Sequence, residues 1–263
     1  MDAQRGEMHY GTEFFASQAP TSQQSARVLV PYIMQILDPA SVVDVGCGTG
    51  AWLSVFGNAG VGDILGIDGQ YVDRELLEIP EHLFLARDLA LPLDIRRQFD
   101  LVVSLEVAEH LPAERGEQFI DSLVSLGSAV LFSAAIPGQG GTSHVNERWQ
   151  AYWVSLFENR DYVCLDVIRP RVWDDERVDW WYRQNTFLLI SAGRLEQNPT
   201  LRDLASVPGG PRSIVHPRLL QIMTARLGTG SGPPTRGSRV RRRLPDPVKK
   251  VLRAGRHLVQ EHF

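Results

Sequence analysis

The chain has 263 residues, of which 43% are hydrophobic and 22% are charged, a composition typical of folded globular proteins and not of disordered ones. Its formal net charge of −4 argues against a protein that mainly holds nucleic acid, and no apolar run approaches the roughly 20 residues of a membrane-spanning helix. The first residues, Met1–Glu7, lack the apolar core of a secretion signal, so we expect a cytoplasmic protein in which both cysteines are reduced.

Residues 1–40 predict an arm followed by a lid helix. Residues 1–20 are polar with embedded aromatic side chains, among which Tyr10 is a candidate contact to a substrate. Apolar residues recur at helical spacing over 23–37, and Pro31 within this pattern predicts a kink.

The stretch 41–50 predicts a buried strand that runs directly into a glycine loop. Its first half is rich in valine, and glycines follow at alternate positions, Gly46, Gly48 and Gly50. A helix is expected next, over 51–59. Glycine permits positive φ angles and lets a ligand lie against the backbone, while the helix N-terminus offers free N–H groups. The stretch therefore predicts a nucleotide-like ligand at the carboxyl end of a parallel strand.

Strands and helices alternate through the rest of the region 41–192, which we expect to be the core domain. This alternation predicts a doubly wound parallel α/β sheet. No crossover helix is evident between the last two strands, so the final strand is expected to run antiparallel. Beyond the first strand and helix, strands are expected over 63–67, 82–85, 99–105, 129–135, 162–168 and 186–191, with helices over 72–78, 112–125 and 146–158.

The remaining residues predict a C-terminal extension over 193–227, with short helices near Pro199 and over 216–227, and then a linker and tail over 228–263. Nine basic and two acidic residues lie between Arg236 and Phe263, so that this segment carries +7 and the rest of the chain carries −11. A solvated tail, a contact with an anionic membrane surface at the inner face, and docking to nucleic acid or protein all remain open.

Acidic residues follow the first three strands. Asp44 lies within the first strand and can order the loop by accepting backbone N–H groups. Asp68 ends the second strand, where a carboxylate can accept hydrogen bonds from both hydroxyls of a ribose. Asp88 and Leu89 follow the third strand, where an acid and an apolar neighbour can hold the edge and the face of an adenine.

As a set, the segments 44–50, 66–68, 88–89 and 99–111 resemble the motif series of class I S-adenosylmethionine-dependent methyltransferases. The resemblance covers residues 41–191 and implies a Rossmann-like sheet of seven strands with the last one reversed. An NAD-dependent Rossmann enzyme is the rival interpretation. It would prefer Gly-x-Gly-x-x-Gly, whereas here the third glycine comes one residue early.

The resemblance also implies the roles of individual residues. Asp68 would hold the ribose of S-adenosylmethionine, and Asp88 and Leu89 would hold its adenine. In relatives with a Glu-x-x-Glu-His segment the first glutamate, here Glu106, faces the cofactor. The methionine pocket would be shaped by Asp44, Gly46, Gly48 and Gly50.

The segment Glu106-Val-Ala-Glu109-His110 is the more discriminating part of the series. If the chain turns helical there, Glu106, Glu109 and His110 share one face, and His144 from the loop after the fifth strand completes a site for Mg²⁺ or another divalent metal. This arrangement resembles the metal site of small-RNA 2′-O-methyltransferases and of ubiquinone-biosynthesis O-methyltransferases. Metal-free relatives carry similar segments, however, and there His144 or His110 would act as a general base or have a structural role.

The segment 140–153 combines a glycine loop with polar and aromatic side chains where this fold places its acceptor pocket. Asn146, Trp149 and Trp153 are candidate substrate contacts, although such aromatic residues equally cover cores or interfaces. The segment resembles those of methyltransferases encoded with surface-polysaccharide and natural-product genes. We therefore expect O-methylation of a small polyhydroxylated acceptor or glycoside. The alternatives are an RNA 2′-O-methyltransferase and a non-catalytic, cofactor-binding partner subunit.

Overall fold

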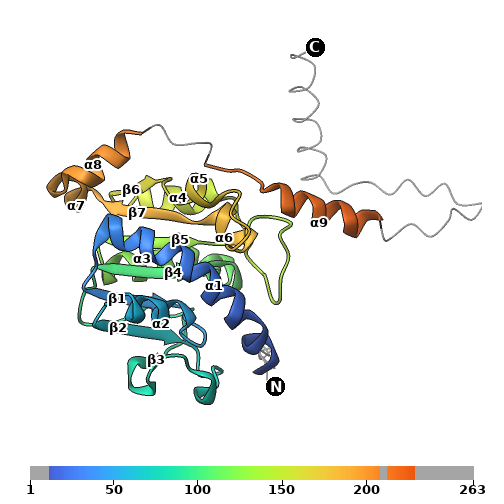
Figure 1. Cartoon of the computed structure of the whole chain (residues 1–263), viewed down its shortest axis with the longest axis horizontal. Helices are drawn as coiled ribbons and strands as arrows, with labels where there is room; N and C mark the ends of the chain where they lie inside the picture. The colour runs from blue at the N-terminus through green and yellow to red at the C-terminus, as the bar shows by residue number, and fades with distance from the viewer. Residues whose placement is uncertain (1–11, 208–211, 229–263) are drawn as a thin grey trace, which may run out of the picture. The chain divides into compact units, whose positions relative to one another are not determined.

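The computed structural model describes residues 12–207 and 212–228, and its centre is one seven-stranded sheet in the order β3-β2-β1-β4-β5-β7-β6 (Figure 1). Neighbouring strands from β3 through β5 run parallel, and β7 is antiparallel to both β5 and β6. The expected doubly wound sheet with a reversed final strand is thereby confirmed. The strands are β1 (Ser41–Val45), β2 (Asp63–Asp68), β3 (Phe84–Ala86), β4 (Leu101–Leu105), β5 (Ala129–Ser133), β6 (Tyr162–Leu165) and β7 (Phe187–Ser191).

The strands are apolar along their length because helices cover both faces of the sheet. Successive side chains of a strand point to opposite faces. Accordingly, Val42 and Val43 of β1 belong to two different hydrophobic clusters, and so do Leu188 and Leu189 of β7.

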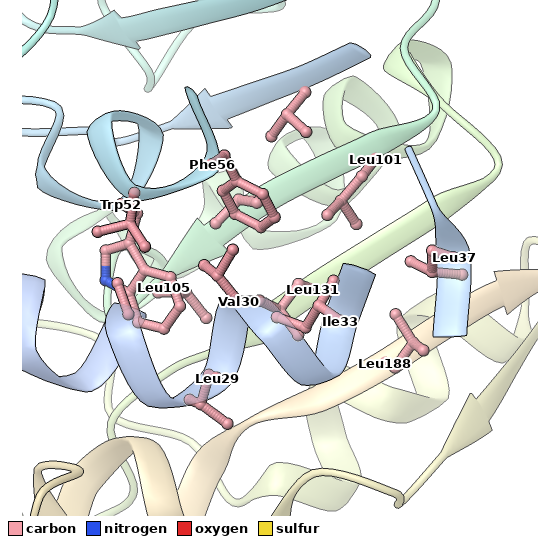
Figure 2. Close-up of a cluster of buried hydrophobic side chains, with 14 of the residues drawn as sticks. Leu29, Val30, Ile33, Leu37, Trp52, Phe56, Leu101, Leu105, Leu131 and Leu188 are labelled. Carbon is pink, nitrogen blue, oxygen red and sulfur yellow. The ribbon is translucent and has the colours of Figure 1, made fainter. Parts of the chain in front are cut away.

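One face of the sheet packs against α1 (Thr12–Leu37), α2 (Ala51–Asn58), α5 (Arg169–Val172), α6 (Trp180–Asn185) and α8 (Pro199–Ser206). Figure 2 shows Leu29, Val30 and Ile33 of α1 in the same apolar cluster as Phe56 of α2. The opposite face packs against α3 (Gly116–Leu126) and α4 (Gln150–Glu158).

The helix expected over 23–37 is longer in the structure, where α1 runs from Thr12 through Pro20 and Pro31. Each proline removes one helical hydrogen bond. Burial of the stripe formed by Leu29, Val30, Ile33 and Leu37, of which three are fully buried, outweighs that loss.

Several boundaries differ from the expected ones, mostly where the chain bends around the carboxyl edge of the sheet. The helix expected over 72–78 is only a 3-10 turn, Arg74–Leu76, and α4 begins at Gln150 instead of residue 146. Two short helices, α5 and α6, lie between β6 and β7, although none was expected there. The structure adds α7 (Ala192–Gln197), and α9 (Pro217–Gly228) lies where a short helix was expected.

The chain forms two units, residues 1–220 and 221–263, and the whole sheet belongs to the first. Tyr10, most of the expected linker and the basic segment lie outside the described residues. Among the residues that are described, no helix combines the length and apolar character needed to cross a bilayer.

Candidate active site

The glycine loop leaves the carboxyl end of β1 and enters α2. Gly46 has a φ angle of 88°, in the left-handed region that favours glycine. A Cβ atom there would lie 2.3 Å from Cγ2 of Val107. Gly46 therefore serves two purposes: it makes the turn, and it lets the segment that follows β4 pack against the loop.

Asp68 is the residue that orders this loop. It ends β2, is 4% exposed, and accepts hydrogen bonds from the Gly48 N–H on Oδ2 (2.7 Å) and from the Gly69 N–H and the Tyr71 hydroxyl on Oδ1 (both 2.6 Å). This corrects the expectation that Asp44 fastens the loop. Burial raises the pKa of Asp68, and the three hydrogen bonds oppose that shift. For Asp44, burial and the charge of Asp68 raise the pKa well above its usual range.

Asp88 and Leu89 follow β3 at the same edge of the sheet. The backbone connects them to Asp68, because the Arg87 N–H donates to the Asp68 carbonyl (2.7 Å). Asp88 is exposed, and its Oδ1 accepts from the Ala90 N–H (2.9 Å), whereas Leu89 is buried. An exposed carboxylate thus lies beside a buried apolar side chain, as the adenine-binding expectation requires.

Glu106 follows β4 with a φ angle of 55°, and its carboxylate points toward two amides. It accepts from Nε2 of Gln139 (2.7 Å) and Nδ2 of Asn185 (3.2 Å). Burial raises the pKa of Glu106, and these hydrogen bonds oppose the shift. Sequence reasoning missed Gln139 and Asn185, because an isolated amide in a loop or short helix carries no signal of its own.

The chain does not turn helical at Glu106, which corrects the expected arrangement of the metal ligands. A 3-10 turn begins only at Ala108 and ends at His110. The structure consequently separates Glu106 from the other three candidates. The group of side chains close enough to share a metal ion consists of Glu109, His110 and His144.

Glu109 is at the centre of this group. It is fully buried. Among the described residues neither of its carboxylate oxygens has a partner at full hydrogen-bond geometry, although the N–H groups of Glu109 and Ala135 lie near enough to lower its pKa. Oε1 of Glu109 lies 4.0 Å from Nε2 of His144, and the His110 and His144 rings meet edge to face with centroids 4.8 Å apart. One ligand atom from each of the three residues lies within 4.8 Å of the other two.

The group has acid–base properties that would suit a cation. Burial raises the pKa of Glu109 well above its usual range, and the charge of Glu106 raises it further. Burial also lowers the pKa of His110 to about 4, assisted by the charge of His144. A carboxyl group that resists ionisation next to an imidazole that resists protonation is a pattern concentrated at functional sites.

The loop after β5 brings His144 to the group. The N–H groups of Val145 and Asn146 both donate to the Glu109 carbonyl (2.9 Å each). Sequence reasoning missed Glu147, whose Oε1 lies 3.0 Å from Nδ1 of His144. Burial alone would raise the pKa of Glu147, but hydrogen bonds from His144 and two loop amides lower it. Its position three residues after His144 in a glycine-rich loop was the available signal.

The expected substrate contacts have different environments. Trp149 is 37% exposed and Val145, which follows His144 in the chain, is 65% exposed, so both side chains are accessible. Asn146 is 3% exposed, and its side chain ties the Ala108 carbonyl to the Arg148 guanidinium. Trp153 is 1% exposed and lies in the core. Packing in the core corrects the expectation that Trp153 contacts an acceptor, whereas a contact by Asn146 stays a prediction.

Comparisons with known proteins agree with this architecture. A family model described as a methyltransferase domain matches residues 20–165, more than half of the chain. A search of curated proteins finds no match.

Solved structures similar to the chain include CalS10 with S-adenosylmethionine bound, an amino pentose methyltransferase from Micromonospora echinaspora involved in calicheamicin biosynthesis. It is 15% identical with a TM-score of 0.53, over 71% of this chain and 99% of CalS10. A protein described as an O-methyltransferase, from Nostoc punctiforme, is 14% identical with a TM-score of 0.50, over 68% of this chain and 59% of that one. Identities this low speak for the fold alone.

Proposed function

The chain belongs to the methyltransferase domain family, and we propose that it transfers the methyl group of S-adenosylmethionine to an oxygen of a small polyhydroxylated acceptor or glycoside. The observation that carries this proposal is the fully buried carboxylate of Glu109, which lies beside two imidazoles and has no well-formed hydrogen bond to the described residues. Such a group is costly to bury, so its presence beside a cofactor loop indicates a role in binding or chemistry.

The donor half of the reaction uses the glycine loop and the acids that follow β2 and β3. The sulfonium methyl group is already electrophilic, so the protein mainly has to align it with the acceptor oxygen. Asp68 would hold the ribose and Asp88 the adenine edge. Asp68 accepts two hydrogen bonds on Oδ1 and one on Oδ2, so a ribose hydroxyl would donate to the second lone pair of Oδ2 or displace the Tyr71 hydroxyl from Oδ1.

The acceptor half would use Glu109, His110 and His144. An alcohol is a poor nucleophile at neutral pH, and a divalent ion, when bound, would lower the pKa of a coordinated hydroxyl. The three side chains fit such an ion, because their ligand atoms lie within 4.8 Å of one another and no well-formed hydrogen bond from the described residues occupies the Glu109 carboxylate. One carboxylate with two imidazoles suits Mn²⁺, Fe²⁺ or Zn²⁺ better than Mg²⁺, which prefers oxygen ligands throughout.

The two histidines would differ in their chemistry. His110, with a pKa of about 4, is neutral at physiological pH, as a metal ligand has to be, but it is a weak base for an alcohol proton. His144 is the better candidate for moving a proton, since its Nε2 faces Glu109 while its Nδ1 is held by Glu147.

The acceptor would approach past Val145 and Trp149, the accessible apolar side chains beside His144. An exposed indole face packs well against the C–H face of a sugar ring. The similar fold of an amino pentose methyltransferase supports a sugar-sized acceptor, although identity this low leaves the acceptor itself open.

Two variants test the donor and acceptor halves separately. Calorimetry should show binding of S-adenosylmethionine that is lost in Asp68→Ala but retained in Glu109→Gln, because only Asp68 belongs to the donor side. Mn²⁺ binding should instead be lost in Glu109→Gln and retained in Asp68→Ala. Methyl transfer to a panel of sugars, glycosides and phenols should fail in both variants.

Chelation distinguishes a metal from a simple base. Loss of methyl transfer on chelation, restored by Mn²⁺, would support the metal. Full activity after chelation would contradict a role for a metal ion and leave His144 as the general base. No cofactor binding in the unmodified protein would contradict the whole proposal.

A further inference from the structure

Glu147 is the only carboxylate, among the described residues, within 4.0 Å of Nδ1 of His144. Oε1 of Glu147 also accepts from the Gly140 N–H (2.7 Å), and Oε2 accepts from the Gly138 N–H (2.7 Å). One side chain thus joins the start of the loop, the middle of the loop and the imidazole.

These contacts determine the tautomer of His144. An ionised carboxylate can only accept hydrogen bonds, so the Nδ1 atom that faces Glu147 must carry the proton. In a neutral imidazole the other nitrogen, Nε2, then has a free lone pair. Nε2 is the atom that lies 4.0 Å from Oε1 of Glu109.

The loop is shaped around the ring in this position. A Cβ atom at Gly141 would lie 2.3 Å from Nε2 of His144, so the imidazole lies directly against the backbone of Gly141. Gly138, Gly140 and Ser143 all have positive φ angles, of 90°, 68° and 59°. Such a backbone is held in place by its contacts, and Glu147 supplies two of them.

We propose that Glu147 is a positioning residue, which holds the Nδ1 proton of His144 and the glycine loop so that the Nε2 lone pair of His144 faces Glu109 and His110. The inference rests on the proposed function only in assigning that lone pair a task, as a metal ligand or as a base. A partner on the second ring nitrogen typically contributes 10- to 100-fold to the metal affinity of a histidine site.

The tautomer can be measured directly by ¹⁵N NMR of the histidine side chains in the full-length, metal-free protein, at a pH where the ring is neutral. His144 is identified by the signals that disappear in His144→Ala. We expect the unmodified protein to show His144 protonated on Nδ1. Glu147→Ala should shift it to a mixture of tautomers, and Glu147→Gln should restore Nδ1 protonation, because an amide oxygen can still accept that proton.

Calorimetry with Mn²⁺ gives the second readout. Glu147→Ala should weaken Mn²⁺ binding 10- to 100-fold while leaving the affinity for S-adenosylmethionine unchanged. Glu114→Gln, which removes an exposed carboxylate from the turn after His110, should change neither readout.

The spectrum of the unmodified protein can overturn the proposal by showing His144 protonated on Nε2, and this outcome requires no Glu147 variant. An unchanged tautomer in folded Glu147→Ala would overturn it as well. If the tautomer shifts as expected but the unmodified protein binds no metal, the positioning role stands and the metal part of the proposed function fails.

Discussion

At the residue scale, burial of the Glu109 side chain lowers the stability of the fold at a position that the proposed reaction uses. The backbone carbonyl of Glu109 accepts hydrogen bonds from Val145 and Asn146, while its carboxylate forms no well-aligned hydrogen bond within the described part of the chain. A buried ionised group without a partner costs stability, and folding therefore favours its protonated form. The free energy lost by burying Glu109 is the kind of cost that functional sites commonly carry.

This cost predicts a specific pH dependence. Because folding raises the pKa of Glu109, the native state holds its proton to higher pH than the unfolded state does. Stability should consequently fall as pH rises from about 4.3, the unfolded value, through the raised pKa. Glu109→Gln cannot ionise, so with chelator present it should be more stable than the unmodified protein near pH 8, by on the order of 1–2 kcal/mol.

Urea unfolding at several pH values measures this effect. The advantage of Glu109→Gln should shrink as the pH falls below the unfolded pKa of about 4.3, where the carboxyl of the unmodified protein becomes protonated in the unfolded state as well as in the folded state. Glu106 and Asp68 also have raised pKa values, so the variant should flatten the pH profile without abolishing its slope. If the free energy of unfolding changes with pH by the same amount in both proteins, the pKa of Glu109 is not raised.

At the scale of the elements, two tryptophans at α4 have different environments: Trp153 is buried within the helix and Trp149, just before it, is partly exposed. Trp153 lies on the buried side of α4, and its ring packs 5.8 Å from that of Phe132 on β5. Trp149 immediately precedes the helix and remains partly exposed beside the candidate site. Helical spacing alone does not separate these two residues, because the helix begins at Gln150 and not at residue 146.

Substitution of the two tryptophans should separate stability from activity. Trp153→Ala removes a buried aromatic ring and should destabilise the fold by about 3–5 kcal/mol. Trp149→Ala should change stability by no more than about 0.5 kcal/mol, as is usual for surface positions, and should raise the KM for the acceptor. Thermal unfolding and methyl-transfer kinetics test both. Equal destabilisation by the two substitutions would contradict the division.

At the scale of the whole molecule, the charge is distributed unevenly along the chain. The last 28 residues, 236–263, carry +7, whereas the remainder carries −11. The sheet, the glycine loop and the three clustered side chains all lie before residue 229. Every residue of the candidate site therefore belongs to the unit formed by residues 1–220.

Removal of residues 229–263 should leave cofactor affinity and methyl transfer within about twofold of the full chain. A basic segment of this charge is expected to bind anionic vesicles at low salt and to release them as salt screens the attraction. Vesicle sedimentation of the full and shortened chains measures this. Tight RNA retention on filters by the full chain alone would instead favour the RNA 2′-O-methyltransferase alternative.

The sequence by itself determined the fold class and the family. Alternating apolar strands and helices, the glycine loop, and the acids at the strand ends are local patterns, each tied to one element. These patterns placed every strand of the sheet to within a few residues and identified Glu109, His110 and His144 as candidates. The cofactor roles of Asp68, Asp88 and Leu89 stay predictions that binding measurements will decide.

Only the tertiary structure decided how the candidate residues are grouped. Glu106 leaves the expected metal set because its positive φ angle and two amide partners, from a loop and from α6, turn its carboxylate away from Glu109. Glu147 joins the candidate site because the glycine loop folds back on His144. Trp153 is removed from the candidate substrate contacts because α4 buries it. Each of these outcomes depends on contacts between residues distant in sequence or on the path of an irregular loop, and neither has a periodicity that a sequence displays.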